Sequence, residues 1–198
     1  MPGNTTARIS FVISACSPIG THGGNTMKTL IVCIGLATAF AGASSGAWAQ
    51  SKASDRASQA FITKAVQGNL AEVQMGQLAQ EKGSSDGVRS YGQMLQQDHT
   101  AAAQKSTAVA TQLGVTPPSE PSKTQKAMHH SLAKLSGAAF DKKFATEMVK
   151  DHKKEIAEYR KAAKKQGDPA GAYASETLPT LQKHLETAQS LTTTTRSR

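Results

Sequence analysis

Residues 86–113, DGVRSYGQMLQQDHTAAAQKSTAVATQL, have the spacing of an amphipathic helix. Apolar residues recur there every seven positions, which puts them on one helical face, and no alternation of period two is sustained. Ser85 can cap the start of this helix, and Gly114, followed shortly by two prolines, ends it. His99 lies on the apolar face, four residues after Leu95. The apolar series is Val88, Leu95, Ala102 and Val109.

Three further segments show the same spacing, so the sequence predicts four long helices and no strands. Short connections follow the first and third helices, which predicts two antiparallel hairpins. A long Pro- and Ser-rich connection joins the hairpins, and a short extra helix is expected within it, over residues 124–135. Two hairpins joined by one crossover is the connectivity of ferritin-like bundles. We therefore expect an all-α, ferritin-like antiparallel four-helix bundle with helices over residues 54–82, 86–113, 138–166 and 169–191.

A secretory signal peptide is expected over residues 27–49. Residues 27–29 (MKT) supply a positive start, residues 30–43 form a short apolar run, and residues 47–49 (AWA) match a cleavage site. The apolar run is short for a membrane-spanning helix. We expect cleavage after Ala49, with an uncleaved N-terminal anchor as the alternative. The mature protein should then be exported, periplasmic or loosely associated with the outer membrane, with no transmembrane span.

The remaining chain, residues 50–198, is long enough for one domain with its own core, which we place at about residues 54–191. Residues 1–26 precede a second, better start, so we interpret them as an extension from a start codon assigned too early. A lipoprotein processing box ending at Cys16 is the alternative for this segment. Cys16 and Cys33 both precede the mature chain, which therefore has no disulfide and no thiolate ligand.

The chain is basic, with 23 Lys and Arg residues against 14 Asp and Glu residues. Basic charge often indicates nucleic-acid binding, but an exported protein meets little nucleic acid, so we expect no such partner. The lysines are spread over helix faces and are interpreted mainly as a solvated surface. Attraction to an anionic envelope surface, lipid or polysaccharide, is the alternative, and an envelope protein is the other partner considered.

A polar layer crosses the predicted bundle. Glu72, His99, His152 and His184 each lie near the middle of a different helix, on its apolar side. Because mid-helix positions of antiparallel neighbours reach similar heights, we expect these side chains to meet in the core. Three residues that could support the layer from its edge are Asp98, Glu147 and Asp151.

Two interpretations of this layer remain open. Neutral imidazoles and a carboxylate suit zinc, iron, manganese or copper, so the layer could hold one transition-metal ion. Buried polar groups need partners, so the same residues could instead form a hydrogen-bonded network that fixes helix pairing. Exposure of some of them to solvent is the third possibility.

The motifs around this layer resemble the bacterial family named domain of unknown function 4142. The matching pieces are Glu72 within GNLAEV, Gln97-Asp98-His99, Leu135-Ser136-Gly137 with Phe140-Asp141, Val149-Lys150-Asp151-His152, and Leu178-Pro179 with His184-Leu185. The resemblance spans about residues 57–191. It implies a four-helix ferritin-like fold in the cell envelope, where members are often labelled outer membrane proteins, and it implies no established activity.

The chain departs from the di-iron proteins of the wider ferritin-like group, which carry Glu-x-x-His on two helices. The residues three positions before the histidines are Gln96, Val149 and Leu181. Carboxylates that could bridge two irons are therefore missing, and a single-ion site fits better than a di-iron site.

No nucleophile elbow, Gly-rich phosphate loop or HExxH motif occurs in the sequence. We therefore expect a non-enzymatic protein of the cell envelope with a binding, interaction or stress-related role. The alternative is a metal-binding or metal-dependent redox protein that uses the polar layer.

Overall fold

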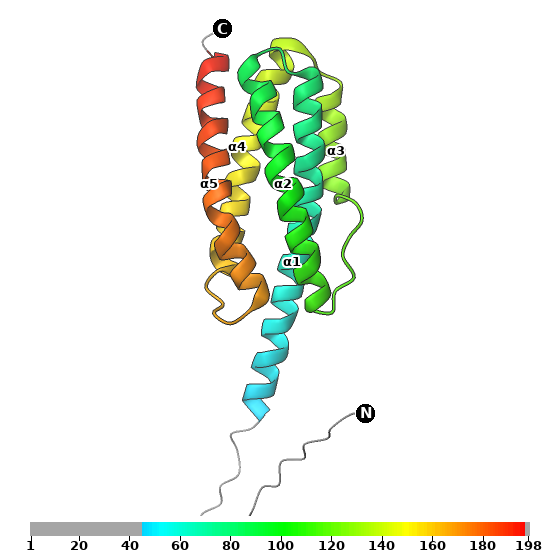
Figure 1. Cartoon of the computed structure of the whole chain (residues 1–198), viewed down its shortest axis with the longest axis vertical. Coiled ribbons are helices and arrows are strands. Elements are labelled where there is room, and N and C mark those ends of the chain that lie inside the picture. Colours follow the sequence, from blue (N-terminus) through cyan, green and yellow to red (C-terminus); the bar gives the residue numbers. More distant parts are fainter. Residues whose placement is uncertain (1–44, 197–198) are drawn as a thin grey trace, which may run out of the picture. The chain divides into compact units, whose positions relative to one another are not determined.

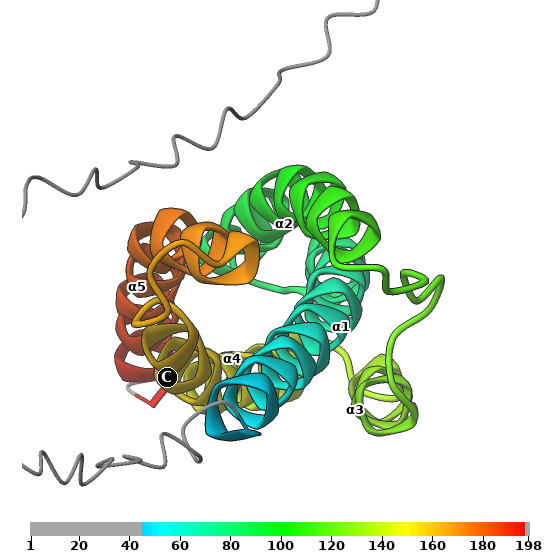
Figure 2. The same ribbon diagram turned by 90° about the horizontal axis from the view of Figure 1, so that it is seen from below.

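The computed structural model describes residues 45–196, with side chains described for residues 55–194. This part of the chain contains five α-helices and no strand, which confirms the all-α prediction (Figure 1). Four long helices form the bundle, and a short fifth helix lies outside it (Figure 2). None of the helices in the described range is both long and apolar enough to cross a membrane.

The first hairpin consists of α1 (Ser45–Lys82) and α2 (Asp86–Gln112). The hydroxyl of Ser85 accepts a hydrogen bond from Val88 N at 3.4 Å and caps α2, as expected. The turn is also fixed from the second hairpin, because the Asp141 carboxylate accepts bonds from the backbone N–H groups of Ser84 and Ser85, both at 2.9 Å. These bonds hold the pKa of Asp141 below its usual value and join the two hairpins at one end.

Two glycines let α1 and α2 approach closely. A Cβ atom added to Gly76 would lie 2.5 Å from Gly92 O, and one added to Gly92 would lie 2.6 Å from Gly76 O. Neither position has room for a side chain, because the obstructing atoms belong to the opposite backbone. The two glycines therefore fix where the helices of this hairpin cross.

The crossover contains α3 (Lys123–Ala133), which begins with a capping box between Ser122 and Gln125. It packs beside α1, on the outside of the bundle (Figure 2). The second hairpin consists of α4 (Gly137–Ala162) and α5 (Pro169–Arg196). Asp168 Oδ1 accepts a bond from Ala170 N at 2.8 Å at the start of α5.

The helix ends differ in detail from the expected ones. α1 begins at Ser45 instead of residue 54, because no proline interrupts residues 45–53 and Ala, Gln and Lys favour a helix. α4 ends at Ala162 instead of residue 166, where the chain turns through Gly167, whose φ is 75°. α5 continues to Arg196 and passes through Pro179 without interruption.

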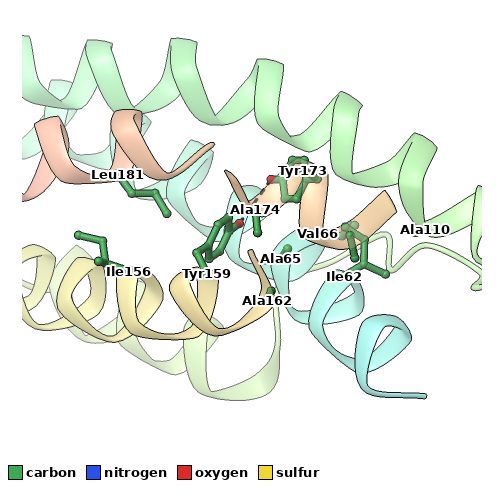
Figure 3. Close-up of a cluster of buried hydrophobic side chains, with 11 residues drawn as sticks. Ile62, Ala65, Val66, Ala110, Ile156, Tyr159, Ala162, Tyr173, Ala174 and Leu181 are labelled. Carbon is green, nitrogen blue, oxygen red and sulfur yellow. Dashed lines mark hydrogen bonds between the residues drawn. The ribbon is translucent and has the colours of Figure 1, made fainter. Parts of the chain in front are cut away.

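The apolar core has two parts, one on each side of the polar layer. One part contains Ile62, Val66, Ile156 and Leu181, and in Figure 3 the Tyr159 and Tyr173 hydroxyls face each other within it. The other part is built largely from aromatic and long aliphatic side chains. These include Met75, Leu78, Tyr91, Leu95, Phe140, Phe144 and Met148. Along each helix, the residue of the polar layer lies between positions that belong to the two parts.

Candidate metal centre

All four residues of the predicted layer are buried. Glu72 on α1 is 1% exposed, His99 on α2 is 2% exposed, and His152 on α4 and His184 on α5 are 0% exposed. The apolar spacing around each residue turns it inward, because its neighbours three, four or seven positions away are core residues. One residue of the layer thus comes from each helix of the bundle.

The structure brings the three histidines together. One ring nitrogen from each of His99, His152 and His184 lies within 4.8 Å of those of the other two. His152 Nε2 and His184 Nδ1 are 3.4 Å apart. Within the described range, these are the residues that form a group with metal-ligand spacing.

The tautomer of His152 follows from its backbone contact. Its Nδ1 lies 3.0 Å from Met148 O. A carbonyl oxygen only accepts hydrogen bonds, so Nδ1 carries the proton. In the neutral ring, Nε2 is then bare, and it is Nε2 that points to His184.

The tautomer of His184 follows from a carboxylate. Its Nε2 lies 2.9 Å from Asp98 Oδ2, so Nε2 donates and Nδ1 is bare. The Asp98 side chain is 37% exposed, whereas that of His184 is fully buried. Asp98 was expected to support the layer, and it does contact one of the histidines.

His99 is oriented by a residue that sequence analysis missed. Its Nδ1 lies 2.9 Å from Asn69 Oδ1. The Asn69 amide nitrogen donates to Ser106 Oγ at 3.1 Å and to Tyr173 OH at 2.8 Å, which leaves Oδ1 to face the ring. His99 Nδ1 therefore donates to Asn69, and His99 Nε2 is a buried nitrogen without a hydrogen-bond partner among the described residues.

The three histidines are arranged so that protons face outward and lone pairs face inward. Burial lowers the pKa of all three, that of His152 to about 3, so the rings are neutral. Neighbouring rings add to this effect for His99 and His152, whereas Asp98 opposes it for His184. Two bare nitrogens cannot hydrogen-bond to each other, so the 3.4 Å pair has no proton to share. Nitrogens that each lie about 2.0–2.1 Å from a tetrahedral ion would be about 3.4 Å apart. The pair has the separation that one shared ion requires.

Glu72 does not join the histidine group. It shares a hydrogen bond with Asp151 instead, and burial raises its pKa well above the usual value. Glu72 therefore keeps its proton and donates it to the Asp151 carboxylate. α1 and α4, which carry the two residues, are in contact. Of the residues expected at the edge, Glu147 is buried but pairs with the exposed Lys143, at 2.7 Å from its Nζ, and not with the histidine group.

A second carboxyl group that the sequence analysis missed lies beside Glu72. Glu155 Oε1 would be 2.9 Å from a Cβ atom at Gly68, so the glycine makes room for this side chain against α1. Burial raises the pKa of Glu155 to about 8. Its Oε2 and that of Glu72 are buried without a hydrogen-bond partner in the described part of the chain. The sequence signal that could have indicated this contact is Gly68, one turn before Glu72.

Comparison with known proteins places the chain in a family but assigns no role to it. No curated protein and no solved structure matches the chain. The family model described as "Domain of unknown function (DUF4142)" matches residues 43–191, which include the residues that orient or form the histidine group: Asn69, Asp98, His99, Met148, His152 and His184. The match covers most of the sequence and agrees with the resemblance seen in its motifs, and the chain therefore belongs to this family of unknown function.

Proposed function

We propose that this protein binds one transition-metal ion between His99, His152 and His184. The observation that carries the proposal is the direction of the lone pairs. Each ring donates its N–H to an acceptor, and one nitrogen of each ring lies within 4.8 Å of those of the other two. Outer acceptors of this kind fix the tautomer and orientation of metal-binding histidines.

The chemistry of the donor set limits the kind of ion. Three neutral imidazoles suit zinc, copper, nickel or iron, whereas magnesium and calcium prefer oxygen ligands. Glu72 and Glu155 hold protons, so these two carboxyl groups add little negative charge to the site. Three protein ligands leave at least one coordination position for water or a small ligand.

We also propose that the protein is exported and acts in the cell envelope. The support is the signal-like segment at residues 27–49, which lies almost entirely outside the described residues. In that compartment the site would meet metal ions directly, and a binding role would need no catalytic residues. Detection of the protein in a periplasmic fraction, with a new N-terminus at residue 50, is the expected result.

Elemental analysis tests the metal proposal. The full chain is purified without an affinity tag beside the triple variant His99→Ala/His152→Ala/His184→Ala. The matched control is His129→Ala/His130→Ala, which removes histidines of α3 that lie outside the group. We expect close to one ion per chain in the wild type and the control, and none in the triple variant.

A structural hydrogen-bonded network gives a different pattern. The wild type would then hold no metal after purification or after titration with zinc or copper, and the triple variant would still be less stable. That result would reject the metal proposal and assign the histidines to helix pairing.

A further inference from the structure

The charged side chains of α4 are separated by sign across the helix. Its acidic residues are all buried or half-buried, namely Asp141, Glu147, Asp151, Glu155 and Glu158. Its exposed charged residues are all basic, namely Lys142, Lys143, Lys150, Lys153, Lys154, Arg160 and Lys161. We call these seven residues the α4 basic stripe. It is on the perimeter of the bundle, because α4 turns its other side to the core (Figure 2).

The stripe is long and straight. At about 100° per residue, its seven positions fall within an arc of about 120° on the helix surface. From residue 142 to residue 161 the stripe extends about 28 Å along the axis. Thr146 and Ala157 are exposed within it and are small, so the long basic side chains stand above them.

Few of these charges are neutralised within the protein. Glu147 pairs with Lys143 at 2.7 Å and approaches Lys150 at 3.9 Å. The other five members of the stripe form no ion pair with a described residue. Glu155 holds its proton and Glu147 already pairs with Lys143. The seven basic residues also outnumber the five acidic residues of α4, so the outer face carries a net positive charge.

We propose that the α4 basic stripe binds the surface of a bilayer that contains anionic phospholipid. The partner is identified by charge complementarity, since a row of lysines on one helical face matches an array of phosphate headgroups. Nucleic acid fits less well, because the stripe has no exposed aromatic residue for stacking and only one arginine for bidentate phosphate contacts. No large apolar side chain is exposed among the lysines, so the protein should adsorb through charge without inserting.

Vesicle co-sedimentation tests this proposal with the full chain. The vesicles contain equal parts of phosphatidylglycerol and phosphatidylcholine, and pure phosphatidylcholine vesicles are the neutral comparison. The test variant is Lys142→Gln/Lys153→Gln/Lys161→Gln, which removes three members of the stripe that form no ion pair. The control Lys82→Gln/Lys123→Gln/Lys134→Gln removes the same charge from exposed positions on α1, α3 and the end of α3.

We expect binding to the anionic vesicles alone, and at least about a tenfold weaker partition coefficient for the stripe variant. The control should change the coefficient less than threefold, and high salt should abolish binding because it screens the charges. Equal losses in the two variants would show a net-charge effect and reject the stripe as the site. Tighter binding to duplex DNA than to anionic vesicles, under the same salt, would also reject the lipid assignment. The melting temperatures of both variants are measured as well, and values close to that of the wild type verify that they fold.

Discussion

The buried polar layer has two halves, which differ in how their polar atoms are satisfied. In the histidine half, His99, His152 and His184 donate outward and leave three bare nitrogens facing one another. In the carboxyl half, Glu72 donates its proton to Asp151, and Glu155 stays protonated beside α1. The first half presents lone pairs that could bind a cation, whereas Glu72 and Glu155 in the second half hold their protons. Burial alone therefore does not determine what a polar cluster does; the direction of its protons does.

The two halves should make the stability of the fold depend on pH in opposite directions. The histidine pKa values are lowered on folding from 6.5, so stability falls as the pH drops below about 6.5 and the unfolded chain gains protons. The pKa of Glu155 is raised from 4.5 to about 8, so stability falls as the pH rises through that range. Of the two halves, only the carboxyl half therefore changes the free energy of unfolding as the pH rises above 6.5.

The largest effect is expected when the histidine half is broken at His152. His152→Ala removes a fully buried ring that contacts Met148 and His184, and should lower the free energy of unfolding by about 2–4 kcal/mol. Urea unfolding followed by circular dichroism measures this. The exposed His130 is the control, and His130→Ala should change the value by less than about 0.5 kcal/mol. Equal effects of the two variants would contradict the burial of the histidine half.

Metal removal should have the next largest effect, and only on the histidine half. A ligand present at about 100 times its dissociation constant stabilises the folded state by about 2.7 kcal/mol. We therefore expect a strong chelator to lower the melting temperature of the wild type but not that of the triple alanine variant. A decrease in both proteins would point to an ion bound elsewhere.

A smaller effect is expected from the carboxyl half. Glu155→Gln keeps the shape of the protonated side chain but cannot ionise. In protein freed of metal with a chelator, the melting temperature of the wild type should fall between pH 6.5 and 8. The melting temperature of the variant should change less over the same range. Glu158→Gln, about one turn farther along α4, is the control. If the wild type and Glu155→Gln have parallel pH profiles, Glu155 is already ionised in the folded protein.

The smallest effect on stability is expected at Asp98, because its side chain is 37% exposed. Asp98→Ala should cost about 1 kcal/mol or less in apo protein. It should nevertheless weaken metal binding by about 10- to 100-fold, since the His184 ring loses the acceptor that orients it. Competition with a chromophoric chelator measures the affinity. Unchanged affinity would mean that packing alone orients His184.

The order of the helices and the inward direction of the histidines could be predicted because both depend on local signals. Helical spacing, caps and connection lengths specify two hairpins and a crossover, and each histidine has core residues one turn away. The partner of Glu72 could not be predicted, because it depends on which helix faces α1 at that height. Asn69 and Glu155 were missed for the same reason: their roles arise from contacts between helices, which the helical spacing of their own segments does not specify.

The close crossing of Gly76 and Gly92 also sets the relative height of residues around the histidine group. Asn69 lies seven residues before Gly76, and His99 lies seven residues after Gly92. In an antiparallel pair, equal offsets from the crossing bring both side chains to one height, about 10 Å from the glycines. A slip of α1 against α2 by one turn would place Val73 or Ala65, near Asn69 in sequence, opposite His99 and leave its outer N–H without an acceptor. Two residues that have no side chain to offer a metal thus set the alignment on which the ligand geometry depends.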